Sequence, residues 1–76
     1  MSNFILNIEI LAGTDIEDAI QEAKHKCNLF DLAYVSFKFN GISVSVGKEA
    51  SVSKGAVRVM DAMRTGVGYV VENGRP

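Results

Sequence analysis

Apolar and polar positions alternate over residues 3–11, which predicts a strand with one buried face because successive side chains point to opposite sides. The apolar face comprises Phe4, Leu6, Ile8 and Ile10, and the other face carries Ile5, Asn7, Glu9 and Leu11. After a break at Ala12-Gly13, apolar positions recur every three or four residues, as on one side of a helix. This stripe consists of Ile16, Ala19, Ile20, Ala23 and Cys27. We expect Thr14 to cap the helix and to form a capping box with Glu17.

The middle of the chain alternates on both sides of Asn40-Gly41. This dipeptide between alternating runs predicts a hairpin, because a type I′ turn needs positive φ at both central residues. A two-residue turn aligns six apolar side chains on one face by pairing Phe39 with Ile42, Phe37 with Val44 and Val35 with Val46. The opposite face carries Tyr34, Ser36, Lys38, Ser43 and Ser45. We therefore expect a hairpin with one apolar and one polar face.

A second amphipathic pattern follows the polar connector after Gly47, with Ser53 as the predicted N-cap and Gly66 as the C-terminal cap. The predicted apolar stripe is Ala56, Val59, Met60 and Met63, and the residues opposite are Lys54, Arg58, Asp61 and Thr65. Val67–Val71 fits a short last strand, and residues 73–76 a frayed tail.

The expected order is strand, helix, strand, strand, helix and a short last strand, which is the order of elements in ferredoxin-like folds. We predict one α+β domain over residues 1–72, built as a two-layer β-α-β-β-α(-β) sandwich. Both helices would cover one face of an antiparallel or mixed sheet, and the other face would stay open.

The composition favours a folded chain that needs stabilisation beyond its own core. Hydrophobic residues make up 47% of the 76 residues, but so short a chain buries a modest core. The lone Cys27 leaves no intrachain disulfide, and with a single histidine, His25, the chain cannot assemble a Cys/His zinc site. A second copy of the chain is the remaining means of stabilisation, so we expect a homodimer.

The N-terminal apolar run lacks a basic region ahead of it and is interrupted by Asn7 and Glu9. These features do not fit a secretory signal or a membrane span, so we expect a cytoplasmic protein.

The candidate chemistry is sparse. On the first helix His25 lies opposite the apolar stripe that holds Cys27, so no nucleophile–base pair is visible. The acidic residues at the start of that helix are explained by the helix dipole. We therefore expect no catalysis, cofactor or metal. The net charge of −1 and an open sheet face with Tyr34 as its only aromatic residue also disfavour nucleic-acid binding.

Two binding hypotheses remain. A protein partner would use a sheet edge or the polar hairpin face, formed by Tyr34, Ser36, Lys38, Ser43 and Ser45. Alternatively, the start of the second helix would hold a small anion or a nucleotide phosphate, with free N–H groups near Gly47 and Ser51 and with Lys48, Ser53, Lys54 and Arg58 as its ligands.

Asp31–Val35, running into Phe37–Gly41, resembles small uncharacterised proteins of bacteriophages and prophages. The resemblance covers residues 31–46, a turn followed by a strand hairpin. It implies an accessory role in which a protein interaction modulates a host or antiviral factor. It assigns no functional residue.

Overall fold

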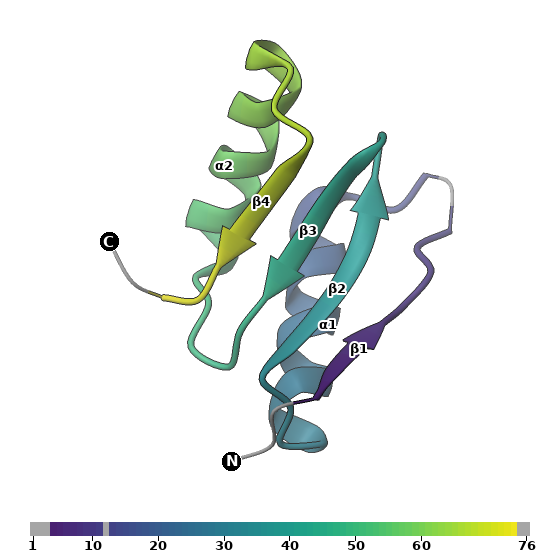
Figure 1. The fold of residues 1–76 in the computed structure, drawn as a ribbon, viewed down its shortest axis with the longest axis vertical. Coiled ribbons are helices and arrows are strands. Elements are labelled where there is room, and N and C mark those ends of the chain that lie inside the picture. The colour runs from purple at the N-terminus through teal and green to yellow at the C-terminus, as the bar shows by residue number, and fades with distance from the viewer. Residues whose placement is uncertain (1–3, 12, 75–76) are drawn as a thin grey trace.

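The computed structural model describes residues 4–11 and 13–74, which form a four-stranded sheet and two helices (Figure 1). The elements are β1 (Ile5–Asn7), α1 (Ile16–Leu29), β2 (Tyr34–Phe39), β3 (Ile42–Val46), α2 (Val52–Thr65) and β4 (Tyr69–Glu72). The predicted α+β class and order of elements are confirmed, including the last strand.

The strands lie in the sheet in chain order, β1-β2-β3-β4. The outer pairs β1–β2 and β3–β4 are parallel, and the central pair β2–β3 is antiparallel. The hairpin has the predicted register, in which Phe39 pairs with Ile42 and Val35 with Val46. Asn40 and Gly41 have φ values of 51° and 81°, as a type I′ turn requires.

Both helices pack on one face of the sheet, and a single core fills the space between the two layers. The helices approach each other closely at Gly55. A Cβ atom there would lie 2.9 Å from Cδ1 of Ile20, which is fully buried on α1. The absence of a side chain at Gly55 therefore makes room for the larger residue of the opposing helix.

The two helical crossovers have opposite hands. Both helices cover the same face, and β1-α1-β2 and β3-α2-β4 each move one strand in the same direction across the sheet. The strands of the first unit run opposite to those of the second. In Figure 1 α1 lies behind the sheet and β2 to the left of β1, which makes the first crossover right-handed. The second is left-handed, the uncommon form.

The first strand is shorter than predicted. The prediction began at Asn3, which lies outside the described residues, and ended at Leu11, whereas β1 spans Ile5–Asn7. Ile8 N–H still donates to the carbonyl of Ser36 at 2.8 Å. Beyond this bond the chain leaves the sheet edge to reach α1, so the alternation continues in residues that pack on the core without strand pairing.

The predicted capping box of the first helix is wrong. The N-cap of α1 is Asp15, whose side chain makes no capping hydrogen bond. Thr14 belongs to the preceding turn, since its N–H donates to the carbonyl of Leu11 at 3.2 Å. Its position one residue too early keeps it from pairing with Glu17 in a box.

The second helix, in contrast, begins earlier than predicted, with Ser51 as its N-cap in place of Ser53. The Oγ atom of Ser51 accepts a hydrogen bond from Lys54 N–H at 3.3 Å. The predicted C-terminal cap is confirmed, because Gly66 has a left-handed conformation with φ 81°.

The prediction for the apolar stripe of α2 is correct for Ala56 and Val59 but wrong for Met60 and Met63. The helix is buried through Gly55, Ala56, Val59 and Ala62, whereas Met60 and Met63 are 58% and 42% exposed. Small side chains bring the helix backbone close to the sheet and to α1. The longer methionine side chains consequently lie at the outside of the layer.

The last strand is shifted toward the C-terminus relative to the predicted Val67–Val71. It ends at Glu72, so an acidic residue joins Val70 on the buried face of β4. Residues of the predicted tail make contacts as far as Gly74, whose N–H donates to Glu72 Oε2 at 2.9 Å. Asn73 Nδ2 donates to the Tyr34 hydroxyl at 3.4 Å, and residues 75–76 lie outside the described residues.

Candidate functional site

The open face of the sheet, away from both helices, holds all the residues that were predicted for protein interaction. Tyr34, Ser36 and Lys38 come from β2, and Ser43 and Ser45 from β3. The strand register pairs Ser36 with Ser45 and Lys38 with Ser43. The two hydroxyls of the first pair lie 2.8 Å apart in a hydrogen bond. The alternation of the hairpin therefore brought the polar side chains together as expected.

The outer strands extend this surface on both sides. On β1, Ile5 lies beside Tyr34 and Asn7 beside Ser36. On β4, Tyr69 lies beside Ser43 and Val71 beside Ser45. We use "open face" for the whole surface, which consists of Ile5, Asn7, Tyr34, Ser36, Lys38, Ser43, Ser45, Tyr69 and Val71.

The open face has a polar centre and apolar rims. Ile5 on one rim is 57% exposed, and Tyr69 and Val71 on the other are 69% and 44% exposed. A shallow hollow of about 380 Å³ in the centre is lined by Asn7, Ile8, Ser36, Phe37, Lys38, Ser43 and Ser45. This arrangement offers hydroxyl groups and one ammonium group between apolar contacts.

The residues that line the hollow include Lys38 but no histidine or carboxylate. His25 is exposed on α1, in the helical layer. Cys27 is fully buried, and its thiol donates to the carbonyl of Leu32 at 3.1 Å. Burial raises the pKa of the Cys27 thiol, and nearby Lys48 only partly offsets this effect. The thiol is a core group rather than a reactive one.

Tyr69 corrects the expectation that Tyr34 is the only aromatic residue on this face. The two rings do not lie side by side. Tyr69 pairs with Ser43, whereas Tyr34 lies one position beyond the pairing of Val35 with Val46. This register separates them by about four residues, or roughly 13 Å along the strands. They consequently do not form the contiguous stacking platform of RNA-recognition domains.

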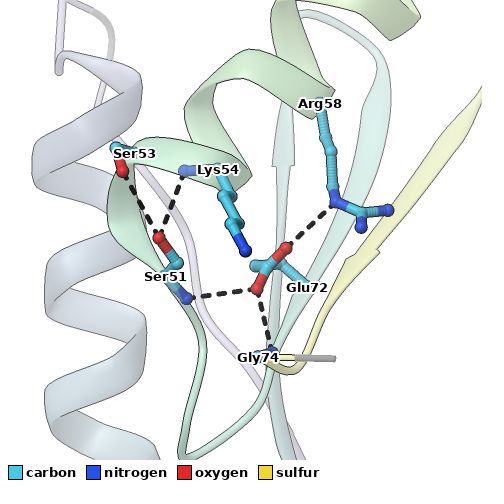
Figure 2. Close-up of polar contacts among 6 residues, drawn as sticks. All are labelled: Ser51, Ser53, Lys54, Arg58, Glu72 and Gly74. Carbon is cyan, nitrogen blue, oxygen red and sulfur yellow. Dashed lines mark hydrogen bonds and ion pairs between the residues drawn. The ribbon is translucent and has the colours of Figure 1, made fainter. Parts of the chain in front are cut away.

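The start of α2 is occupied by a carboxylate of the chain itself (Figure 2). Glu72 is 1% exposed. Its Oε2 accepts hydrogen bonds from Ser51 N–H at 3.1 Å and from Gly74 N–H at 2.9 Å. Its Oε1 lies 3.0 Å from Nε of Arg58 without an aligned hydrogen bond, so this contact is an ion pair. Paired in this way, the buried charge is tolerated.

The residues predicted to hold an anion do not form one group in the structure. Lys48 forms an ion pair with Asp31. Ser53, Lys54 and Arg58 lie on the first turns of α2, where the Ser53 and Ser51 hydroxyls are 3.3 Å apart. Figure 2 shows the Lys54 side chain directed toward the same region as Glu72. An external anion at this place would have to compete with that carboxylate.

Glu72 is the residue that sequence reasoning missed. One signal was available: it stands two positions after Val70 and therefore on the same face of a strand whose other face carries Tyr69 and Val71. An acidic residue in such a position requires a cation and N–H donors. Which segments supply them depends on the tertiary fold.

No protein-family model, curated protein or solved structure matches the chain. Among residues 4–11 and 13–74, no three histidine, cysteine or acidic side chains gather as metal ligands. Neither helix of this part of the chain is long and apolar enough to cross a membrane.

Proposed function

We propose that the protein acts by binding another protein at the open face of its sheet, without catalysis. The observation that carries this proposal is the pattern of that face, in which exposed Ile5, Tyr69 and Val71 flank a hollow lined by hydroxyls and Lys38. Protein interfaces use apolar and aromatic contacts together with scattered hydrogen bonds, and the open face offers groups of both kinds.

The chemistry of the open face defines a complementary partner surface. Lys38 is the cation among the residues of this face, so a carboxylate of the partner fits opposite it. Apolar side chains fit against Tyr69 and Val71 on one rim and against Ile5 on the other. The resemblance of residues 31–46 to phage proteins supports a host or antiviral factor as this partner.

Anion binding at the start of α2 is the weaker alternative. Two cations of the predicted site have internal partners, since Arg58 pairs with Glu72 and Lys48 with Asp31. The N–H of Ser51 is also engaged by Glu72. These contacts leave less charge and fewer donors for a ligand than the sequence indicated.

Site-specific photo-crosslinking in cells tests the proposal. A photoreactive side chain at Ser43 should crosslink a defined partner, whereas one at Gln21, an exposed position on α1, should not. Ser43→Arg fills the hollow and should reduce partner capture about tenfold or more, as expected for a change at an interface centre. The matched variant Gln21→Arg should leave capture unchanged. Equal crosslinking from both positions, or capture that survives Ser43→Arg, would contradict the proposal.

A further inference from the structure

The outer edge of β4 offers unpaired backbone groups. Ser43 N–H donates to the carbonyl of Gly68, and Gly47 N–H donates to that of Glu72. In a parallel ladder this pattern directs alternate residues of β4 toward β3. The N–H and C=O groups of the intervening residues, Tyr69 and Val71, therefore point outward from the edge, in the plane of the sheet.

The sequence of this edge lacks the residues that usually block strand pairing. The residues of β4 are Tyr-Val-Val-Glu, with no proline, lysine or bulge to protect the edge. Its side chains at Tyr69 and Val71 are exposed, and the helix next to it leaves a groove of about 390 Å³ along the strand. A second strand would meet the edge at this groove, beside α2.

The groove carries one positive and one negative side chain on the α2 side. Arg58 and Asp61 lie about one helical turn apart and both line it. Figure 2 shows the terminal nitrogens of Arg58 turned away from Glu72, which contacts Nε. Asp61 contacts only the exposed Arg64 of its own helix among the ion pairs of the described residues.

We infer that β4 pairs with β4 of a second copy of this chain, antiparallel about a two-fold axis. Such an axis places the same surface on both partners, so the surface must complement itself. A groove with one cation and one anion meets this condition, because reversal of the helix direction brings Arg58 of one copy opposite Asp61 of the other. The outward groups of Tyr69 and Val71 then bond with those of the second strand.

The result is a continuous sheet of two four-stranded halves, with all four helices on one side. The two open faces join into one surface on the other side. This pairing uses a strand edge rather than the open face, so it stands independently of the proposed partner. It also adds hydrogen bonds and buried area to a domain of 76 residues, whose own core is small.

Sedimentation velocity of the full chain at tens of micromolar (a typical order for moderate association) should show a dimer. Val71→Pro removes an outward N–H that the monomer does not use, and should weaken dimerisation about tenfold or more. Asp61→Arg places like charges opposite each other and should also shift the equilibrium toward monomer. Glu22→Arg, which alters a similar exposed pair with Lys26 on α1, should have no effect.

Amide hydrogen exchange locates the interface. The N–H groups of Tyr69 and Val71 should exchange slowly at concentrations that favour the dimer and rapidly in the Asp61→Arg variant. A monomer at every concentration up to about 1 mM would overturn the inference. So would a dimer in which these two amides exchange rapidly, because its interface would lie elsewhere.

Discussion

The two β-α-β units of the molecule share an order of elements, but they differ in hand and in the contacts that hold them together. Each has two parallel strands joined by a helix of 14 residues. The right-handed unit, β1-α1-β2, is stabilised by apolar packing, with Ile20 and Cys27 fully buried. The left-handed unit, β3-α2-β4, buries small residues of its helix and adds polar contacts from Ser51 and Glu72.

The difference shows what an uncommon crossover needs. Right-handed crossovers follow the natural twist of strands, so non-directional packing suffices to complete them. In the left-handed unit, Glu72 at the end of β4 accepts a hydrogen bond from the N–H of Ser51 at the start of α2 and pairs with Arg58 about two helical turns later. These directional contacts fix the strand relative to the helix that precedes it.

The largest expected effect comes from the apolar contact between the units. Ile20→Ala should destabilise the protein by about 2–5 kcal/mol, because it leaves a cavity beside Gly55 in the core. A urea titration measures this loss. Val57→Ala on the outer side of α2, where the side chain is 65% exposed, should change stability by under about 0.5 kcal/mol. An equally small loss for Ile20→Ala would mean that the helices do not meet there.

Removal of the buried carboxylate should have a smaller and more local effect. Glu72→Ala leaves Ser51 N–H and Gly74 N–H without their acceptor, which should cost about 1–3 kcal/mol. Hydrogen exchange should accelerate at the start of α2 and leave the α1 amides close to their original rates. Glu17→Ala, at an exposed position of α1, is the control. Uniform acceleration across both helices would show that Glu72 does not specifically stabilise the second unit.

The smallest expected difference lies between the two helix caps. Ser51→Ala should cost about 1 kcal/mol because the Oγ acceptor of Lys54 N–H is lost. Asp15→Ala should cost about 0.5 kcal/mol or less, since that side chain makes no capping hydrogen bond and only its attraction to the helix dipole disappears. Thermal unfolding of both variants shows which substitution lowers the stability more. A greater loss for Asp15→Ala would reverse the comparison between the units.

Local patterns in the sequence predicted the hairpin and its polar face because both depend on neighbouring residues. Asn40-Gly41 determines the turn, and the turn determines that Ser36 lies opposite Ser45. The extension of this face by Tyr69 and Val71 could not be predicted in the same way. It depends on which strand lies beside β3, and no local signal specifies that partner.

The second helix shows a different limit of prediction from the sequence pattern. Large apolar residues at helical spacing predicted burial of Met60 and Met63, but the buried side of the helix includes Gly55 and Ala62, which bring the backbone close to its neighbours. The anion site was likewise predicted from free cations and free N–H groups at the helix start. That expectation could not include Glu72, which reaches this position only when β4 pairs with β3.

The chain-order arrangement of the sheet bears on how the molecule folds. Every strand pairs only with strands adjacent to it in the sequence, from Val35 with Val46 in the hairpin to Ile5 with Tyr34 and Ser43 with Tyr69 in the crossovers. The hairpin closes the shortest loop, so it is the least costly nucleus in chain entropy. Growth can then proceed outward in both directions, with each helix docking as its own outer strand arrives.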